Sequence, residues 1–189
     1  FLNNDIEILE ENWLQELVRE AGRTDVGVAG AKLFFKNGFV QHGGIIVGLG
    51  EVAQEAHVNE YRNSHGYCDR LLFAQRYSAV KGACLAVRRQ VFQEMSGFDA
   101  KKAPIHFFDV DFCLRVDEAG HKVIWTPYAQ LAHSGGVSKC AAFAPQTSAT
   151  REIEVQYMKN RWSRFIEQDR WYSPNLTRVG QSFELPSQS

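Results

Sequence analysis

The feature that most constrains the fold is a tight-turn signal between two apolar runs. Residues 26–35 form a run of small and branched apolar side chains, which is typical of a strand, and residues 39–42 follow directly after Lys36-Asn37-Gly38. An Asn-Gly pair between two such runs predicts a hairpin, because both residue types accept the positive φ angles of a tight turn. The sequence therefore predicts an antiparallel pair of strands.

Strand-like and helix-like patterns alternate along the rest of the chain. Further strands and extended pieces are expected at residues 77–87, 122–125 and 129–133, with a turn at Pro127. Helices are expected at residues 13–21, 88–95, 109–119 and 150–166. Two segments without clear periodicity are expected to be loops, residues 43–66 and 134–149. Together with the hairpin, this alternation predicts an α/β fold whose sheet has mixed strand directions.

Composition fits a globular chain with one sizeable core. The chain has 189 residues, of which 44% are hydrophobic and 23% are charged. We expect one domain at residues 1–168 and a C-terminal tail at residues 169–189 that lies along a surface of the domain. A formal net charge of -1 provides no bulk attraction for nucleic acid or for an anionic membrane. The four cysteines are widely spaced, which indicates neither a zinc site nor a disulfide framework and suits a cytosolic protein.

Two carboxylates stand at the start of the expected helix at residues 109–119. Asp109 is an N-cap candidate, and in that position free N–H groups and the helix dipole would favour its ionised form. Asp111 is two positions further on and would point about 200° away from Asp109 on a helix. It could pair with Arg115, four residues later. On this stretch alone, both residues could also be ordinary first-turn acids.

Several motifs in order along the chain carry a family resemblance. They are Asn3-Asn4-Asp5, residues 27–33, Val40-Gln41-His42-Gly43-Gly44, residues 78–85, Gly97-Phe98-Asp99, residues 109–115, Trp125-Thr126-Pro127-Tyr128, His133 and residues 171–176. Together they resemble the second half of a family 2 glycosyltransferase, most closely of the bacterial rhamnosyltransferase-like branch. The motifs span nearly the whole chain, which makes the resemblance specific.

The resemblance implies a fold and a reaction. The fold would be an incomplete GT-A fold, a Rossmann-like mixed sheet flanked by helices, with a C-terminal helix and an extended tail. The reaction would be inverting transfer of a sugar from a nucleotide-sugar donor to a hydroxyl of a saccharide or lipid-linked saccharide acceptor, in bacterial surface polysaccharide synthesis. Such a protein would use Mg²⁺ or Mn²⁺, would have no nucleic acid partner, and would lie in the cytoplasm or peripherally at the inner face of the membrane.

The resemblance also implies a metal and nucleotide site. The acid-x-acid turn of the family falls on Asn3-Asn4-Asp5, so Asp5 would be the carboxylate ligand, and Asn3 replaces the first acid with an amide. His133 falls on a histidine that completes the metal site in many relatives, although the Glu-Ser that usually follows is replaced by Ser134 and glycines. The alternatives are an Asx-rich turn that caps the next helix and a structural histidine.

By the same comparison, Asp109 falls on the catalytic base of the family. Asp111 would support it by hydrogen bonding within the fold or to the acceptor. Gly82 and Ala83 match a pair of small residues beneath the donor sugar, and close strand packing is the alternative explanation for both. The residue before the base is often acidic or an amide in the family and is Phe108 here, which would make the site drier.

The resemblance begins at a strand in the middle of the family's catalytic domain. As a fragment, the chain is therefore expected to fold without turnover, and to self-associate through an open sheet edge that begins at Phe1-Leu2. The identity of the donor nucleotide is not encoded in this part of the family's fold. A rival interpretation is a non-catalytic carbohydrate-binding or interaction domain that keeps the fold and lacks the chemistry.

Overall fold

The computed structural model describes residues 1–134 and 144–186. Its helices are α1 (Trp13–Ala21), α2 (Arg89–Glu94), α3 (Phe108–Glu118), α5 (Ala144–Arg161) and α6 (Ser163–Glu167), with a 3₁₀ turn at Tyr67–Asp69. Its strands are β1 (Ile6–Ile8), β2 (Val26–Phe34), β3 (Val40–His42), β4 (Ile45–Val47), β5 (Ala53–Glu55), β6 (Gln75–Arg76), β7 (Leu85–Val87) and β8 (Lys122–His133). None of the helices in these two described ranges is long and apolar enough to cross a membrane.

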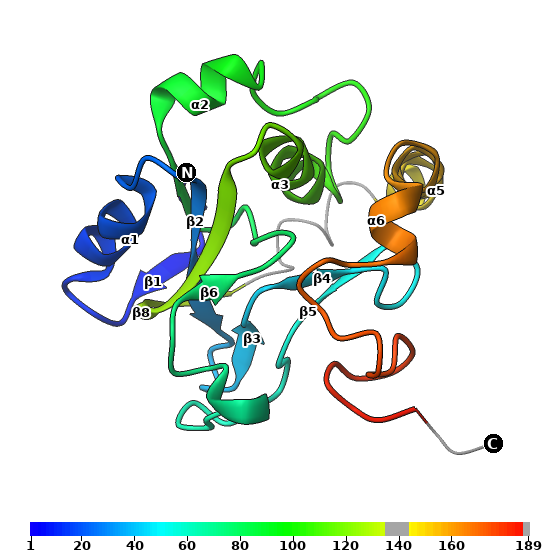
Figure 1. Ribbon diagram of the computed structural model, residues 1–189. Coiled ribbons are helices and arrows are strands. Elements are labelled where there is room, and N and C mark those ends of the chain that lie inside the picture. Colours follow the sequence, from blue (N-terminus) through cyan, green and yellow to red (C-terminus); the bar gives the residue numbers. More distant parts are fainter. Residues whose placement is uncertain (135–143, 187–189) are drawn as a thin grey trace.

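The main sheet is mixed, as the sequence predicts. Its strands run in the order β1-β8-β2-β3, with β6 paired to β8 and β7 paired to β2 (Figure 1). The long central strands β2 and β8 are parallel, and every other pairing in this sheet is antiparallel, including the predicted hairpin of β2 and β3. This α/β architecture with flanking helices is consistent with part of a GT-A fold.

Helices cover both faces of the sheet. The helix α1 packs against β2 and β8 and buries Leu17 and Ala21 in a small cluster with the alanines of those strands. The helix α3 lies on the opposite face, where Phe112, Leu114 and Trp125 belong to the larger core. Figure 1 shows α1 on one side of the sheet and α3, α5 and α6 on the other. The strand β2 is buried on both faces and is a nearly continuous apolar run, whereas β8 contains polar residues and the exposed Tyr128.

The prediction of one long loop at residues 43–66 is wrong in its first part. Residues 45–47 and 53–55 pair as the antiparallel hairpin of β4 and β5. The turn between them uses Gly48 and Gly50, which have φ angles of 78° and 68° that favour glycine. The strands are three residues each, which is too short for an alternating pattern to be seen in the sequence.

Other element boundaries also differ from the expectations. The strand predicted at residues 77–87 is confined to β7 at its end, and the middle of this segment is irregular. The strand β8 continues through Pro127, where the pairing with β2 shifts register and absorbs the interruption. The helix α5 begins at Ala144, inside the segment expected to be a loop.

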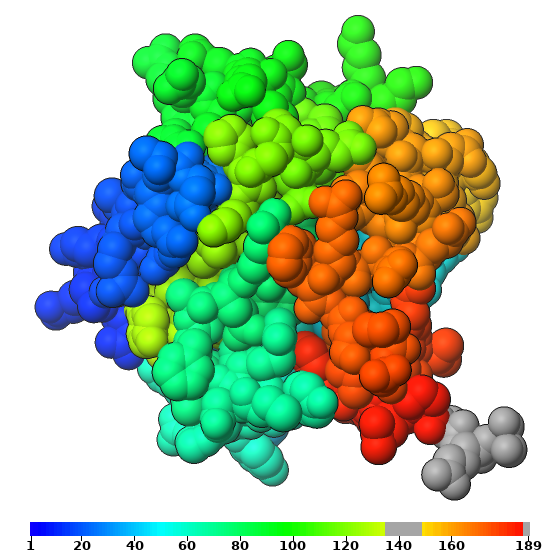
Figure 2. All heavy atoms as spheres, in the orientation of Figure 1, coloured from blue at the N-terminus to red at the C-terminus, as the bar shows by residue number. Residues whose placement is uncertain are grey.

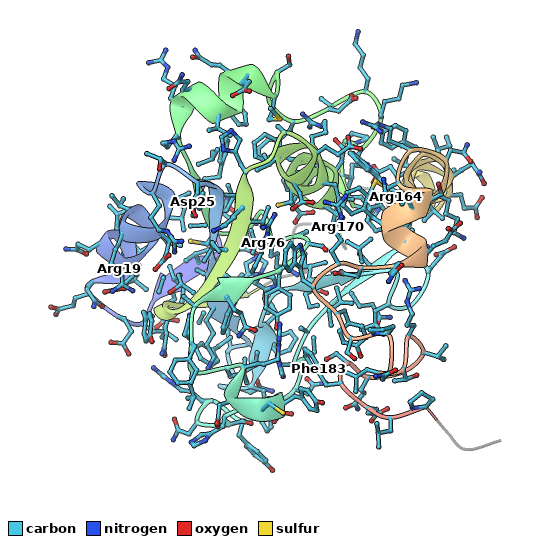
Figure 3. All side chains as sticks on the ribbon, viewed as in Figure 1. Arg19, Asp25, Arg76, Arg164, Arg170 and Phe183 are labelled. Atoms are coloured by element: carbon cyan, nitrogen blue, oxygen red, sulfur yellow. The ribbon has the colours of Figure 1, made fainter. Side chains whose placement is uncertain are left out.

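The C-terminal tail is bound to the rest of the chain by buried polar contacts. The buried carboxylate of Asp169 accepts hydrogen bonds from the Val47 amide at 2.7 Å and from the Ser78 hydroxyl at 2.8 Å. The buried Asp117 of α3 pairs with Arg76 at 2.6 Å and with Arg170 of the tail at 3.1 Å, and Figure 3 labels both arginines. Figure 2 shows the tail, in orange and red, lying against the surface formed by the segment that contains β6.

Candidate functional site

The pairing of β1 with β8 brings Asp5 and His133 together. Ile6 is the register partner of His133, and the Ser134 amide donates to the Asp5 carbonyl at 3.0 Å. The Asp5 carboxylate, which is 23% exposed, has its Oδ1 atom 3.3 Å from Nε2 of His133. These two residues, predicted as metal ligands and 128 positions apart in the sequence, are therefore neighbours.

A buried glutamine fixes the orientation of the His133 ring. The side-chain amide of Gln41 donates to the His133 carbonyl at 3.1 Å, and its Oε1 lies 2.7 Å from Nδ1 of the ring. An amide oxygen only accepts hydrogen bonds, so Nδ1 carries a proton and the lone pair of a neutral ring is at Nε2. Nε2 faces both the Asp5 carboxylate and the side-chain amide of Asn3, and a cation between Nε2 and the carboxylate would take both as ligands.

The residues present fit a divalent cation with a small protein ligand set. Asp5 supplies a carboxylate oxygen, His133 supplies an imidazole nitrogen held by a second residue, and the side-chain nitrogen of Asn3 lies 3.5 Å from the same imidazole nitrogen. Within residues 1–134 and 144–186, no group of three His, Cys, Asp or Glu side chains could hold a metal ion. A cation here would therefore take further oxygens from a phosphate ligand or from water.

Asp109 lies in the first turn of α3 but does not cap it. The N-cap position is Phe107, so the prediction of Asp109 as N-cap is wrong. The Asp109 carboxylate is buried and accepts two backbone hydrogen bonds, from the Gly82 amide at 2.7 Å and from the Val110 amide at 2.9 Å. One carboxylate therefore accepts hydrogen bonds both from the segment before β7 and from the start of α3.

Burial determines the acidity of this carboxylate. Desolvation raises the pKa of Asp109 above its ordinary value, against the opposing effects of the Gly82 amide and the positive charge of Lys81. The expectation that the helix end favours the ionised form is therefore corrected, because the cost of burial exceeds the stabilisation by N–H groups. A carboxylate with a raised pKa is a stronger base than an exposed one.

Asp109 faces a small cavity that also contains a charged pair. The cavity has a volume of about 140 Å³, and its walls include Phe108, His106 and the ion pair of Lys81 with Glu55. Burial would raise the pKa of Glu55, but the charge and hydrogen bond of Lys81 hold it below its ordinary value. Sequence reasoning missed this pair, since Glu55 falls in a segment read as a loop and no spacing links it to Lys81.

His42 holds the backbone beside the Asp109 cavity. It is buried, and desolvation lowers its pKa to about 3, so the ring is neutral. Its Nε2 atom accepts a hydrogen bond of 3.2 Å from the Lys81 amide. The histidine thus anchors the segment that supplies the Gly82 amide to Asp109. The family resemblance includes His42, but only the structure gives it a role.

Gly82 and Ala83 connect the two parts of the site. A Cβ atom on Gly82 would lie 2.6 Å from the Phe108 ring, so close packing accounts for the glycine. The Ala83 carbonyl accepts a hydrogen bond of 2.9 Å from the Asn3 amide. One short segment therefore contacts Asn3 on one side and Asp109 on the other. A position beneath the donor sugar stays a prediction for both residues.

Asp111 points away from Asp109 into the core. It is fully buried, and its oxygens accept hydrogen bonds from Arg115 at 2.8 Å, from the Tyr157 hydroxyl at 2.9 Å and from the Trp162 indole at 2.9 Å. The predicted pair with Arg115 is confirmed. Of the two supporting roles considered for Asp111, these contacts favour hydrogen bonding within the fold.

Comparison with known proteins identifies the family of the chain. Residues 2–173 match the family described as "Glycosyltransferase like family 2", and the chain belongs to this family. It is 39% identical over 186 residues to the uncharacterized protein y4gI of Sinorhizobium fredii (strain NBRC 101917 / NGR234), a match that covers 98% of this chain and 20% of that protein.

A second relative is named for a biological role. The chain is 32% identical over 181 residues to the O-antigen biosynthesis protein RfbC of Myxococcus xanthus, which covers 94% of this chain and 14% of RfbC. The chain thus spans a fifth or less of the length of either of these two relatives.

Proposed function

We propose that this chain forms the acceptor side and the metal side of an inverting glycosyltransferase site. The observation that carries the proposal is the continuous arrangement of Asp5, His133, the segment at Gly82 and Ala83, and Asp109. It combines a cation-binding pair suited to a diphosphate with a buried carboxylate suited to proton abstraction. The donor would be a nucleotide-sugar and the acceptor a saccharide or lipid-linked saccharide.

The proposed reaction uses Asp109 as the general base. The Asp109 carboxylate takes the proton of the acceptor hydroxyl while the hydroxyl oxygen forms a bond to the anomeric carbon. The bond from that carbon to the diphosphate breaks on the opposite face, and its electron pair leaves with the nucleoside diphosphate. A divalent cation held by Asp5 and His133 would neutralise part of the negative charge of the diphosphate. Attack from the face opposite the leaving group inverts the anomeric configuration.

The proposed biological setting is surface polysaccharide synthesis in a bacterium. It rests on the similarity to a protein that is named for O-antigen biosynthesis. Nucleotide-sugars are made in the cytoplasm, so we place the protein there or at the inner face of the membrane.

The alternative is a non-catalytic carbohydrate-binding domain. It is favoured by Phe108, whose ring lies in the wall of the Asp109 cavity, at a position where the family resemblance implies a polar side chain. Against it, a binding domain would have no need to bury a carboxylate such as Asp109 beside a cation-binding pair.

A transfer assay on the full-length protein, with every segment that adjoins this chain, tests the proposal. The protein is incubated with a panel of uridine, thymidine and guanosine diphosphate sugars, MnCl₂ and oligosaccharide acceptors, and release of nucleoside diphosphate is measured. NMR of the product then gives the anomeric configuration. We expect release that depends on acceptor and a product of inverted configuration. Saccharide binding without any release would support the alternative, and a retained configuration would exclude Asp109 as base in this mechanism.

A further inference from the structure

A second and larger cavity lies beside the Asp109 cavity. Its volume is about 730 Å³, and it is formed by the segment 54–67 together with residues 180–184 of the tail. Figure 3 labels Phe183, which projects from the tail toward that segment. The tail therefore forms one wall of this cavity. The residues of the tail belong neither to the proposed cation pair nor to the Asp109 cavity.

A stack of three rings lies along this wall. Phe183 is stacked on His57, with ring centres 4.4 Å apart, and on Tyr67, with ring centres 5.1 Å apart and planes within 9°. His57 is buried, whereas 44% of Tyr67 is exposed. Tyr67 thus presents a flat aromatic surface that is backed by Phe183 and cannot turn freely. Such a surface suits the C–H face of a sugar ring, which is apolar and slightly positive.

The remaining lining is polar and acidic. It includes amides, hydroxyls and carboxylates and no lysine or arginine: Gln54, Glu55, Asn59, Glu60, Ser64, Gln181, Ser182 and Glu184. Burial lowers the pKa of His57 to about 3, so this histidine adds no positive charge near neutral pH. Within the described parts of the chain, Glu60 and Glu184 form no ion pair with a basic residue. The carboxylates of Glu60 and Glu184 therefore make the lining acidic and disfavour an anionic ligand, against the positive charge of Arg70, whose guanidinium lies 5.3 Å from the Phe183 ring centre.

The two cavities share a wall. Gln54 and Glu55 of β5 line both of them, and Glu55 pairs with Lys81 beside Asp109. A ligand seated against Tyr67 could therefore extend past β5 toward the proposed base. A ligand of this length is larger than one sugar, because the two volumes together exceed what a single sugar ring would fill.

We propose that the cavity between residues 54–67 and 180–184 binds the non-reacting sugars of an acceptor saccharide that is neutral or amino-substituted and carries no acidic groups. The inference rests on the proposed function, since it assigns the larger cavity to the acceptor of the same reaction. Tyr67 stacks on a sugar ring, and Glu60 and Glu184 accept hydrogen bonds from hydroxyl, amide or ammonium groups. These acids also select against uronic acids and phosphorylated sugars.

Ligand-observed NMR tests this assignment without donor, metal or turnover. Saturation-transfer spectra are recorded on the protein with three matched probes: the trimer of N-acetylglucosamine, the trimer of glucosamine and the trimer of galacturonic acid. We expect transfer to the first two probes and none to the third. Stronger transfer to the galacturonic acid trimer than to both others would overturn the proposal.

Three variants locate the binding. Tyr67→Ala should weaken binding of the N-acetylglucosamine trimer by about tenfold, because it removes the stacking surface. Tyr61→Ala is the matched control, since Tyr61 is 72% exposed in the same segment and does not line the cavity. Glu184→Lys should weaken binding of the glucosamine trimer and allow binding of the galacturonic acid trimer. Unchanged affinities in both Tyr67→Ala and Glu184→Lys would place the saccharide elsewhere.

The result can be separated from the fate of the proposed function. Asp109→Asn should change the affinity for the trimers far less than Tyr67→Ala does, since Asp109 lies outside the larger cavity. If the wild-type protein binds the trimers and transfers no sugar, the cavity is assigned correctly and the catalytic proposal fails. If the protein transfers sugar and Tyr67→Ala leaves the acceptor KM unchanged, the catalytic proposal stands and this assignment fails.

Discussion

The backbone amide of Gly82 donates a hydrogen bond of 2.7 Å to Oδ2 of Asp109, although the two residues are 27 positions apart. The other carboxylate oxygen accepts from the Val110 amide at 2.9 Å. Both oxygens are therefore held, and the carboxylate has a fixed direction in its cavity. A general base gains from such a fixed position, because little reorganisation is needed when the proton is transferred.

Asp109→Asn should reduce turnover about a thousandfold, because the amide has no basicity. An asparagine also turns its NH₂ group toward one of the two amide donors, and we expect a loss of about 1–2 kcal/mol in the free energy of unfolding. Turnover is measured in the transfer assay and stability by urea denaturation.

The control for this change is Asp25→Asn, at an exposed carboxylate that pairs with Lys122. It should alter turnover by less than about twofold, since a surface ion pair contributes little. If Asp109→Asn keeps most of the wild-type rate, Asp109 has no part in the mechanism.

Gly82→Ala should destabilise the protein and disturb Asp109 at the same time. The new methyl group would lie 2.6 Å from the Phe108 ring, and overpacking of this kind costs about 2 kcal/mol. The double variant Gly82→Ala with Phe108→Leu should recover part of the stability, because the smaller side chain makes room. Thermal melts of the four proteins in this cycle give the coupling. Strictly additive losses would mean that the two side chains do not compete for the same space.

The fold was predictable where a local rule determines it. The Asn-Gly turn predicts the hairpin of β2 and β3, and apolar runs predict the buried central strands. The hairpin of β4 and β5 was not predictable, since its three-residue strands are too short to show a period and depend on two glycines in the turn. The sequence predicts a turn at Pro127, but a register shift between β8 and β2 accommodates the proline within the strand.

The site was predictable only where the family resemblance supplied it. The resemblance names Asp5, His133 and Asp109, and the structure brings the first two to 3.3 Å. No local pattern in the sequence shows that Gln41 orients His133 or that Glu55 pairs with Lys81. These contacts depend on how distant segments pack. The acidity of Asp109 also needed the structure, because burial opposes the effect of the helix end.

Asp111 should matter to stability more than to chemistry. Its carboxylate is fully buried and accepts from Arg115, Tyr157 and Trp162. Asp111→Ala should lower the free energy of unfolding by about 3 kcal/mol or more, since it leaves the partly buried Arg115 guanidinium without its carboxylate and the buried Trp162 indole without an acceptor. Tyr157→Phe removes one hydrogen bond and should cost about 1 kcal/mol. Its turnover per folded molecule should equal that of the wild type, and a loss of turnover in this mild variant would link Asp111 to catalysis.

Asp5→Ala should weaken nucleotide-sugar binding mainly in the presence of MnCl₂. The change removes the oxygen ligand of the proposed cation pair, so the cation would no longer strengthen binding of the diphosphate. Calorimetric titration with and without Mn²⁺ measures the effect, with Asp25→Ala as the control at a carboxylate that pairs with Lys122. Gln41→Ala should cause a smaller loss in the same direction, because His133 would no longer be held. Equal weakening with and without the cation would make Asp5 a turn residue.

Lys81→Met should move the acid limb of the pH–rate profile to higher pH. The positive charge of Lys81 lowers the pKa of Asp109, and Glu55 raises it, so removal of the lysine leaves Asp109 beside an unpaired negative charge. The loss of the positive charge and the unpaired negative charge of Glu55 each raise the pKa of Asp109 further. A general base must be ionised before attack, so a higher pKa means that more of the enzyme is inactive at mildly acidic pH.

Measurement of kcat/KM across pH for the wild type and for Lys81→Met tests the direction in which the acid limb shifts. Lys122→Met is the matched control, because Lys122 also pairs with a carboxylate, Asp25, but does not line the Asp109 cavity. The double variant Lys81→Met with Glu55→Gln removes both charges and should return the acid limb toward its wild-type position. A shift of the limb to lower pH in Lys81→Met would show that the rate does not depend on ionised Asp109. A shift of equal size in Lys122→Met would assign the effect to net charge and not to the cavity.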